Sequence, residues 1–104
     1  MLKDVLLILV SLNNTQKQLF YTTLIHDCTL ITRSLITSTY DEEEKLRLIR
    51  IMNEIIHIIS VRMESVVQNA AKEDENTIAI IEELLSRSEV ISNLFTHFAS
   101  YKHN

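Results

Sequence analysis

The chain has 104 residues, a formal net charge of −4 and 46 % hydrophobic residues, and it contains no glycine, no proline and no tryptophan. This length suits a single domain over residues 1–104. The apolar content is high enough for a folded core, which excludes a disordered chain. Tight β-hairpins and phosphate-binding loops rely on glycine. Its absence argues against β-sandwiches, P-loop proteins and dinucleotide-binding folds, and it favours an all-α fold.

Charge and cysteine content further narrow the class of protein to which the chain can belong. The sequence pI is about 5.5, and no basic cluster of the kind that nucleic-acid-binding proteins present is visible. Cys28 has no second cysteine to pair with, which favours a cytoplasmic protein. The longest unbroken apolar run, Val5 to Val10, is far shorter than the ~20 residues of a membrane span. The start of the chain also lacks the small-residue cleavage site of a signal peptide. We therefore expect no membrane association.

The first predicted helix covers the segment before residue 37. It carries two apolar rows at helical spacing, Leu2, Val5, Leu6, Leu9 and Leu12, followed by Phe20, Leu24, Cys28, Ile31 and Leu35. Between the rows stands NNTQKQ, residues 13–18, in which Thr15 and Gln18 have capping-box spacing. A break near residues 13–15 is one alternative. Without glycine or proline, one continuous helix is slightly favoured.

The second predicted helix, residues 41–70, has the clearest period. One apolar row alternates at three and four residues, and it consists of Ile49, Met52, Ile56, Ile59, Met63, Val66 and Ala70. A second row lies beside it and consists of Leu48, Ile51, Ile55 and Ile58. The two rows are wider than one helix contact needs. We therefore expect two neighbours for this helix, and we assign the second row to self-association in a homodimer. Thr39 and Glu42 fit a capping box at its start.

The third predicted helix follows AKEDEN, with Asp74 or Asn76 as its cap, and ends near Lys102. Its apolar row contains Ser88 in line and consists of Ile78, Ile81, Leu84, Leu85, Ile91, Leu94, Phe95 and Phe98. Connections near residues 37–40 and 71–76 are short, which makes neighbouring helices antiparallel. The sequence thus predicts an antiparallel bundle of three long helices, or four if the first breaks, that is elongated and dimeric.

Two groups of residues could carry chemistry, and both have a simpler interpretation. Glu54 and His57 have the Glu-x-x-His spacing of di-iron bundles. The motif occurs once, and the heptad register places both side chains opposite the apolar rows, so we predict a solvated face without metal. Cys28 lies on an apolar row, where a thiol usually packs as a small hydrophobic side chain. We therefore predict no catalytic residue, no metal and no cofactor.

The remaining candidates concern binding of another protein. Arg62 ends the second apolar row of its helix and could border an interface. The aromatic residues Phe95, Phe98 and Tyr101 gather near the chain end, where core packing is the simpler interpretation and a partner site the alternative. We predict a non-enzymatic protein that binds a partner protein through apolar helix faces, such as an inhibitor, antitoxin, regulator or chaperone. A DNA-binding transcriptional regulator is the alternative, and a metal-binding helical-bundle enzyme is disfavoured.

Overall fold

The structure is a computed structural model that describes residues 8–9, 11–66 and 71–102. Its four long helices are α2 (Asn14–Ile36), α3 (Glu42–Ser65), α4 (Ala71–Ser86) and α5 (Glu89–Lys102). The described residues contain no β-strand. The all-α fold expected from the missing glycine and proline is therefore confirmed.

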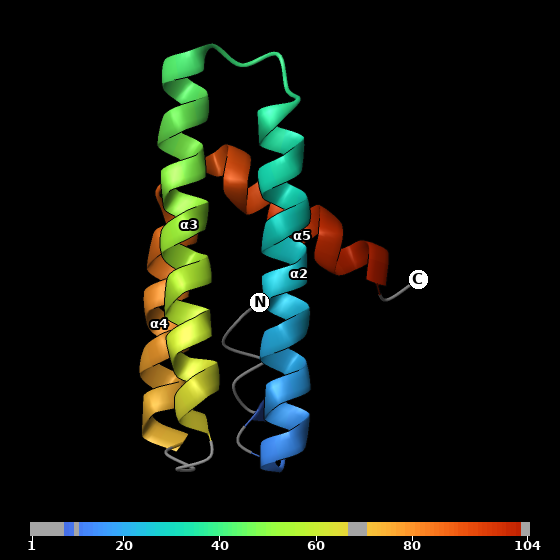
Figure 1. Ribbon diagram of the computed structural model, residues 1–104, viewed down its shortest axis with the longest axis vertical. Coiled ribbons are helices and arrows are strands. Elements are labelled where there is room, and N and C mark those ends of the chain that lie inside the picture. Colours follow the sequence, from blue (N-terminus) through green and yellow to red (C-terminus); the bar gives the residue numbers. More distant parts are fainter. Residues whose placement is uncertain (1–7, 10, 67–70, 103–104) are drawn as a thin grey trace.

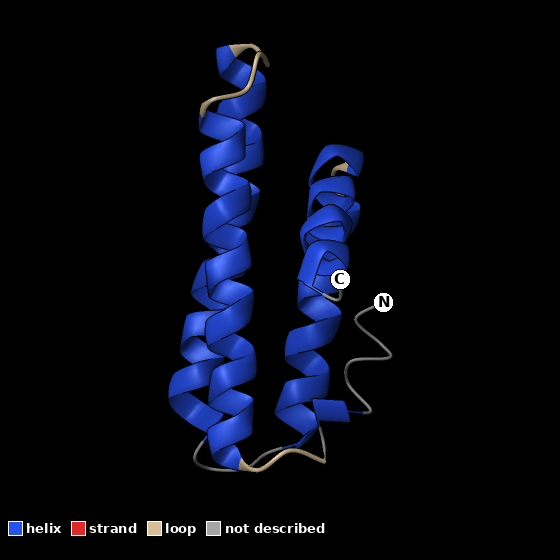
Figure 2. Cartoon of the chain, turned by 90° about the vertical axis from the view of Figure 1, so that its right-hand side faces the viewer, coloured by secondary structure: helices blue, strands red, loops and turns tan. Residues whose placement is uncertain are grey.

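The helices form two layers. α2 and α3 make a long antiparallel hairpin, and α4 runs back along α3 (Figure 1). α5 then turns away from α4 and crosses behind α2, which it contacts. Seen from the side, the α2–α3 hairpin stands on one side and the α4–α5 pair on the other (Figure 2). The principal extents are 42 × 28 × 19 Å.

The first predicted helix is broken, contrary to the slight preference for one continuous helix. Residues 11–13 form a turn, and α2 begins at Asn14. The side chain of Asn13 accepts a hydrogen bond from the main-chain N–H of Gln16 at 2.9 Å, and the Gln16 side chain accepts from the main-chain N–H of Asn13 at 3.0 Å. This is a capping box. It uses Asn13 and Gln16 in place of the expected Thr15 and Gln18.

The third predicted helix is also broken, which the apolar row did not indicate. α4 ends at Ser86, and Ser88 caps α5 by accepting from the N–H of Ile91 on its hydroxyl at 3.4 Å. The Ser88 carbonyl accepts from the N–H of Ser92 at 3.0 Å.

The N-terminal cap of α3 also differs from the predicted one. Asp41 and not Thr39 is the N-cap, and its side chain accepts a hydrogen bond from the N–H of Glu44 at 2.8 Å.

One hydrophobic core joins the helices, and α3 contributes to it on two sides. α3 packs against both α2 and α4, so its two expected neighbours come from its own chain. Leu48, Ile51 and Ile55 are buried there, and Ile58 is partly buried. These four residues were assigned to self-association. Because the same chain already covers the first three, no second copy is needed to remove them from water, and the homodimer stays a prediction.

No helix in the described ranges combines the length and the apolar content that crossing a bilayer requires.

The capping box of α2 gives a direct test of the break before Asn14. Replacing Asn13 by Ala removes the side-chain acceptor and leaves the N–H of Gln16 without it. We expect the free energy of unfolding to fall by about 1 kcal/mol, as measured by urea unfolding. The exposed Gln18→Ala change on the same helix should shift it by less than about 0.5 kcal/mol. Equal effects of the two changes would contradict the capping role.

Candidate functional site

A buried cluster of charged and polar side chains ties three helices together at one end of the bundle. α2 supplies Lys17 and Tyr21, α3 supplies Arg62, and α4 supplies Asp74. All four residues are at most 4 % exposed. Charged residues are almost never this deeply buried unless they are paired, so the pairing inside the cluster is what allows its burial.

Asp74 is the common acceptor of the cluster. Its Oδ1 accepts from the Tyr21 hydroxyl at 2.7 Å and from Arg62 Nε at 2.6 Å. Its Oδ2 accepts from Lys17 Nζ at 2.9 Å. Charge-assisted hydrogen bonds of this length are the strongest that side chains form. Asp74 was expected as a helix cap, but α4 already extends from Ala71 and the carboxylate points into the bundle instead.

The surroundings fix the protonation states of two members. Burial alone would raise the pKa of Asp74, but the hydrogen bonds from Arg62, Tyr21 and Lys17 outweigh it and hold that pKa below its usual range. Burial, followed by the hydrogen bond to Asp74, raises the pKa of Tyr21. At neutral pH Asp74 is therefore ionised and Tyr21 protonated, and neither is poised to exchange a proton as an acid–base catalyst would be.

Arg62 also connects the cluster to the surface. Its Nη1 donates to Glu73 Oε2 at 2.7 Å. The side chain of Arg62 is 3 % exposed, whereas that of Glu73 is 58 % exposed. The position of Arg62 at the end of an apolar row predicted a residue bordering an interface, or otherwise a plain surface residue. The structure instead buries it against Asp74, and its role in partner binding stays a prediction.

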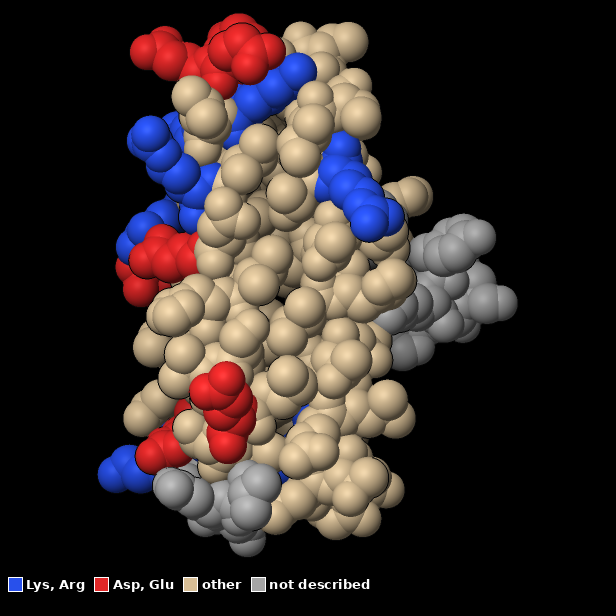
Figure 3. Space-filling view, in the orientation of Figure 1, with Lys and Arg blue, Asp and Glu red and all other residues tan. Residues whose placement is uncertain are grey.

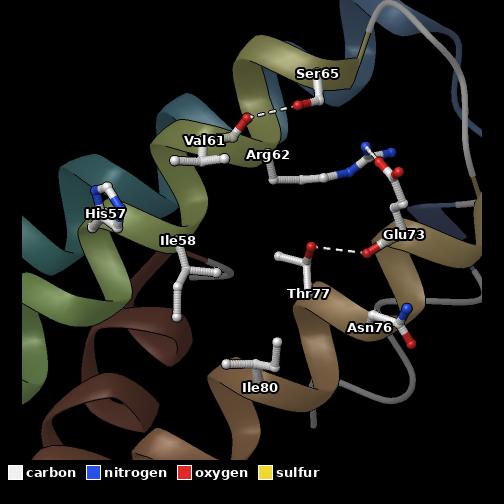
Figure 4. A pocket seen from close by; sticks show the side chains of 9 residues that line it. All are labelled: His57, Ile58, Val61, Arg62, Ser65, Glu73, Asn76, Thr77 and Ile80. Carbon is white, nitrogen blue, oxygen red and sulfur yellow. Dashed lines mark hydrogen bonds and ion pairs between the residues drawn. The ribbon is translucent and has the colours of Figure 1, made fainter.

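Beside this ion pair lies an open groove of ≈ 330 Å³ between α3 and α4. Its volume is at the lower end of the range of about 300–1,000 Å³ that bound ligands occupy. The residues that line it are His57, Ile58, Val61, Arg62, Ser65, Glu73, Asn76, Thr77 and Ile80. Figure 4 shows Ile58 and Ile80 facing each other at one end of the groove, and Glu73 beside the tip of Arg62 at the other. The groove therefore has an apolar end and a charged end.

The hydroxyl groups in the groove are already hydrogen-bonded within their own helices. Ser65 donates to the carbonyl of Val61 at 3.0 Å, and Thr77 donates to the carbonyl of Glu73 at 2.8 Å (Figure 4). When a partner covers these two hydroxyl groups, each keeps the carbonyl acceptor that it already has. The free-energy penalty for covering these two hydroxyl groups is correspondingly small.

The Glu-x-x-His pair lies where the heptad register placed it. Glu54 and His57 are both exposed, and Glu54 Oε2 lies 3.8 Å from Arg87 Nη1. Within the described ranges, no three His, Cys, Asp or Glu side chains are grouped closely enough to hold a metal ion. His57 does line the groove, which the spacing argument did not anticipate.

Cys28 is fully buried in the core. Burial, with a smaller contribution from the Asp27 charge, raises the pKa of its thiol to about 12. A thiol with so high a pKa carries almost no thiolate at neutral pH, which makes it a poor nucleophile.

The aromatic candidates are only partly described. Phe95 is 4 % exposed and belongs to the core, which is the simpler of the two interpretations offered for this group. The side chains of Phe98 and Tyr101 lie outside the described residues.

Sequence reasoning missed Lys17 and Tyr21, and it misjudged Asp74. One signal for them was present, because Lys17, Tyr21 and Leu24 follow the spacing of the apolar row of α2. A lysine on such a row suggests a buried partner, but the pattern cannot reveal that Asp74 provides it.

Compared with known protein families, curated proteins and solved structures, the chain shows no significant match to any of them.

The ion cluster predicts a large stability effect for Asp74→Asn. The substitution removes the negative charge between Lys17 and Arg62 and leaves two buried cations without it. We expect the free energy of unfolding to fall by about 3–5 kcal/mol. The neighbouring Glu75 is exposed, so Glu75→Gln should change it by less than about 0.5 kcal/mol. A loss of under about 1 kcal/mol for Asp74→Asn would contradict the cluster.

The same carboxylate predicts an acid-sensitive part of the stability. The pKa of Asp74 is lower in the folded chain than in the unfolded chain. The unfolded chain therefore binds the proton first as the pH falls. The stability difference between wild type and Asp74→Asn should be complete above about pH 4 and shrink below it. Urea unfolding of both proteins across this range measures the difference, and a gap that stays constant into strong acid would argue against it.

Proposed function

We propose that the chain is a non-enzymatic binding protein that holds a segment of a partner protein in the α3–α4 groove. The observation that carries the proposal is the gathering of exposed aliphatic side chains around this hollow. Val61 is 50 % exposed and Ile80 is 45 % exposed, and both line the groove together with the partly buried Ile58. Single exposed aliphatic residues are ordinary, but several that converge on one concave surface are typical of a binding site.

The polar residues nearby support binding over catalysis. Asp74 accepts three hydrogen bonds and has a lowered pKa, and Tyr21 keeps its proton, so neither of these two side chains suits a general base or a nucleophile. What it offers is a rigid floor, because Arg62 is locked to Asp74 at 2.6 Å. A groove with a fixed floor suits a partner because little conformational entropy is lost when it is filled.

Charge pairing favours a protein partner over DNA. Several surface cations are engaged with carboxylates of the same chain, with Arg47 at 2.7 Å from Glu44 and Arg87 at 3.4 Å from Glu83. In Figure 3, the Lys and Arg side chains at the upper left lie between groups of Asp and Glu side chains, whereas basic atoms farther right lie among uncharged side chains. Binding to the phosphate backbone would need cations that are free to replace counterions.

Selection from a displayed library of random peptides tests the groove directly. Peptides selected on the immobilised full-length chain should bind Val61→Arg and Ile80→Arg at least about tenfold more weakly than wild type, by fluorescence anisotropy. The reason is that an arginine at either position fills the hollow and places an unpaired charge in it.

The matched control is Leu46→Arg. Leu46 is 53 % exposed and lies on α3, but it does not line the groove. Selected peptides should bind this variant as tightly as wild type. Peptides that bind wild type, Val61→Arg, Ile80→Arg and Leu46→Arg equally would refute the groove as the binding site. A selection that yields no binder would also refute it. Circular dichroism confirms that each variant keeps its helix content.

A further inference from the structure

The charged end of the groove has an uneven balance of charge. The buried charged members of the cluster are two cations, Lys17 and Arg62, and one carboxylate, Asp74. Tyr21 keeps its proton and adds no charge. A second carboxylate, that of Glu73, reaches Arg62 from the surface. An exposed carboxylate thus helps to balance a buried positive charge.

The two carboxylates that bind Arg62 differ in how firmly they are held. Asp74 is 0 % exposed and receives three hydrogen bonds from α2 and α3. Glu73 is 58 % exposed, and its contact with Arg62 Nη1 is an ion pair at 2.7 Å. An exposed glutamate regains water when it leaves, so its release costs little. Arg62 stays bound to Asp74 when Glu73 leaves, and its Nη1 then faces the groove, where a carboxylate could pair with it.

The groove places this anion position next to its aliphatic side chains. Arg62 and Val61 are consecutive on α3, and Glu73, Thr77 and Ile80 follow one another along α4. Figure 4 shows the Arg62 side chain reaching across toward Glu73, with the gap between Ile58 and Ile80 opening beside it. A segment that fills the gap with aliphatic side chains brings its neighbouring side chains to the Glu73 carboxylate.

We propose that the partner segment carries an aspartate or glutamate beside aliphatic residues, and that its carboxylate displaces Glu73 from Arg62. The inference rests on the proposed function, because it names the chemistry of the partner that the same groove holds. Arg62 then binds the carboxylate of the partner, and Glu73 balances the charge of Arg62 when no partner is bound.

Displacement of Glu73 would also explain selectivity. A partner carboxylate replaces one anion by another and leaves Arg62 compensated. A neutral or basic side chain brings no anion for Arg62, so it leaves Glu73 in place and gains no added affinity from this position. Glu73 therefore reduces the preference for an anionic partner without abolishing it, and the aliphatic end of the groove supplies attraction to apolar side chains of any partner.

Two matched peptides and one substitution test the inference on the full-length chain. The probe is an acetylated and amidated alanine-rich helical peptide with one central glutamate and leucines on the same face. The comparison peptide carries glutamine in place of the glutamate. Fluorescence anisotropy gives the Kd of each peptide for wild type and for Glu73→Gln, which removes the competing charge but keeps the side-chain shape.

In Glu73→Gln we expect the glutamate peptide to bind about tenfold more tightly than the glutamine peptide. In wild type the same preference should be smaller, because Glu73 competes for Arg62. Glu75→Gln is the matched control, since it removes the same charge from the exposed neighbour on α4 that does not line the groove. Its peptide preference should equal that of wild type.

Three outcomes would overturn the inference. Equal Kd values for the two peptides in Glu73→Gln would show that Arg62 does not bind the peptide carboxylate. In that case, loss of binding of both peptides in Val61→Arg would still support the proposed function. A preference of the same size in wild type and Glu73→Gln would show that Glu73 is not displaced. Release of the bound glutamate peptide by a short DNA duplex at equal concentration would assign the anion position to phosphate.

Discussion

The structure depends on one buried carboxylate. Asp74 on α4 has no exposed surface, and its hydrogen bonds come from Lys17 and Tyr21 on α2 and from Arg62 on α3. A buried ion of this kind tolerates few alternative arrangements, because losing any one donor leaves charge or polar atoms without a partner. We therefore expect the cluster to favour the register in which the three helices meet at this end of the bundle.

The groove follows from the same constraint. Because Arg62 Nε is bound to Asp74, the guanidinium stays inside and its Nη1 reaches the surface carboxylate of Glu73. The stem of Arg62 then lies along the groove that Val61 and Ile80 border. A fixed cation below an aliphatic hollow combines the two elements that small recognition sites use, a surface to dry and an anchor for orientation. The proposed binding of a partner segment rests on this arrangement.

The helix boundaries show why local sequence leaves alternatives open. In a chain without glycine and proline, the starts of α2, α3 and α5 are each marked by a side chain that caps the helix. Near each start the chain offers two capping residues a short distance apart, Asn13 and Thr15 before α2, and Thr39 and Asp41 before α3. Asn and Asp are better N-cap residues than Thr, and the structure uses Asn13 and Asp41. The apolar period continues through Ser88 although α4 has ended and α5 begins there, because α4 and α5 can each bury one apolar face.

Within the described residues, the sequence alone determined the all-α class, the main apolar rows of the helices, the outward direction of Glu54 and His57 and the burial of Cys28. These properties follow from composition and from the helical period, which act over a few residues. The predicted row members Leu2, Val5, Leu6 and Ala70 lie outside the described residues. Only the tertiary structure decided that the third apolar stretch forms two helices, that α3 is covered by its own chain, and that Arg62 is buried. The reason is distance along the chain, because Lys17 and Asp74 stand 57 residues apart and meet only when the bundle closes. No local pattern encodes such a pair.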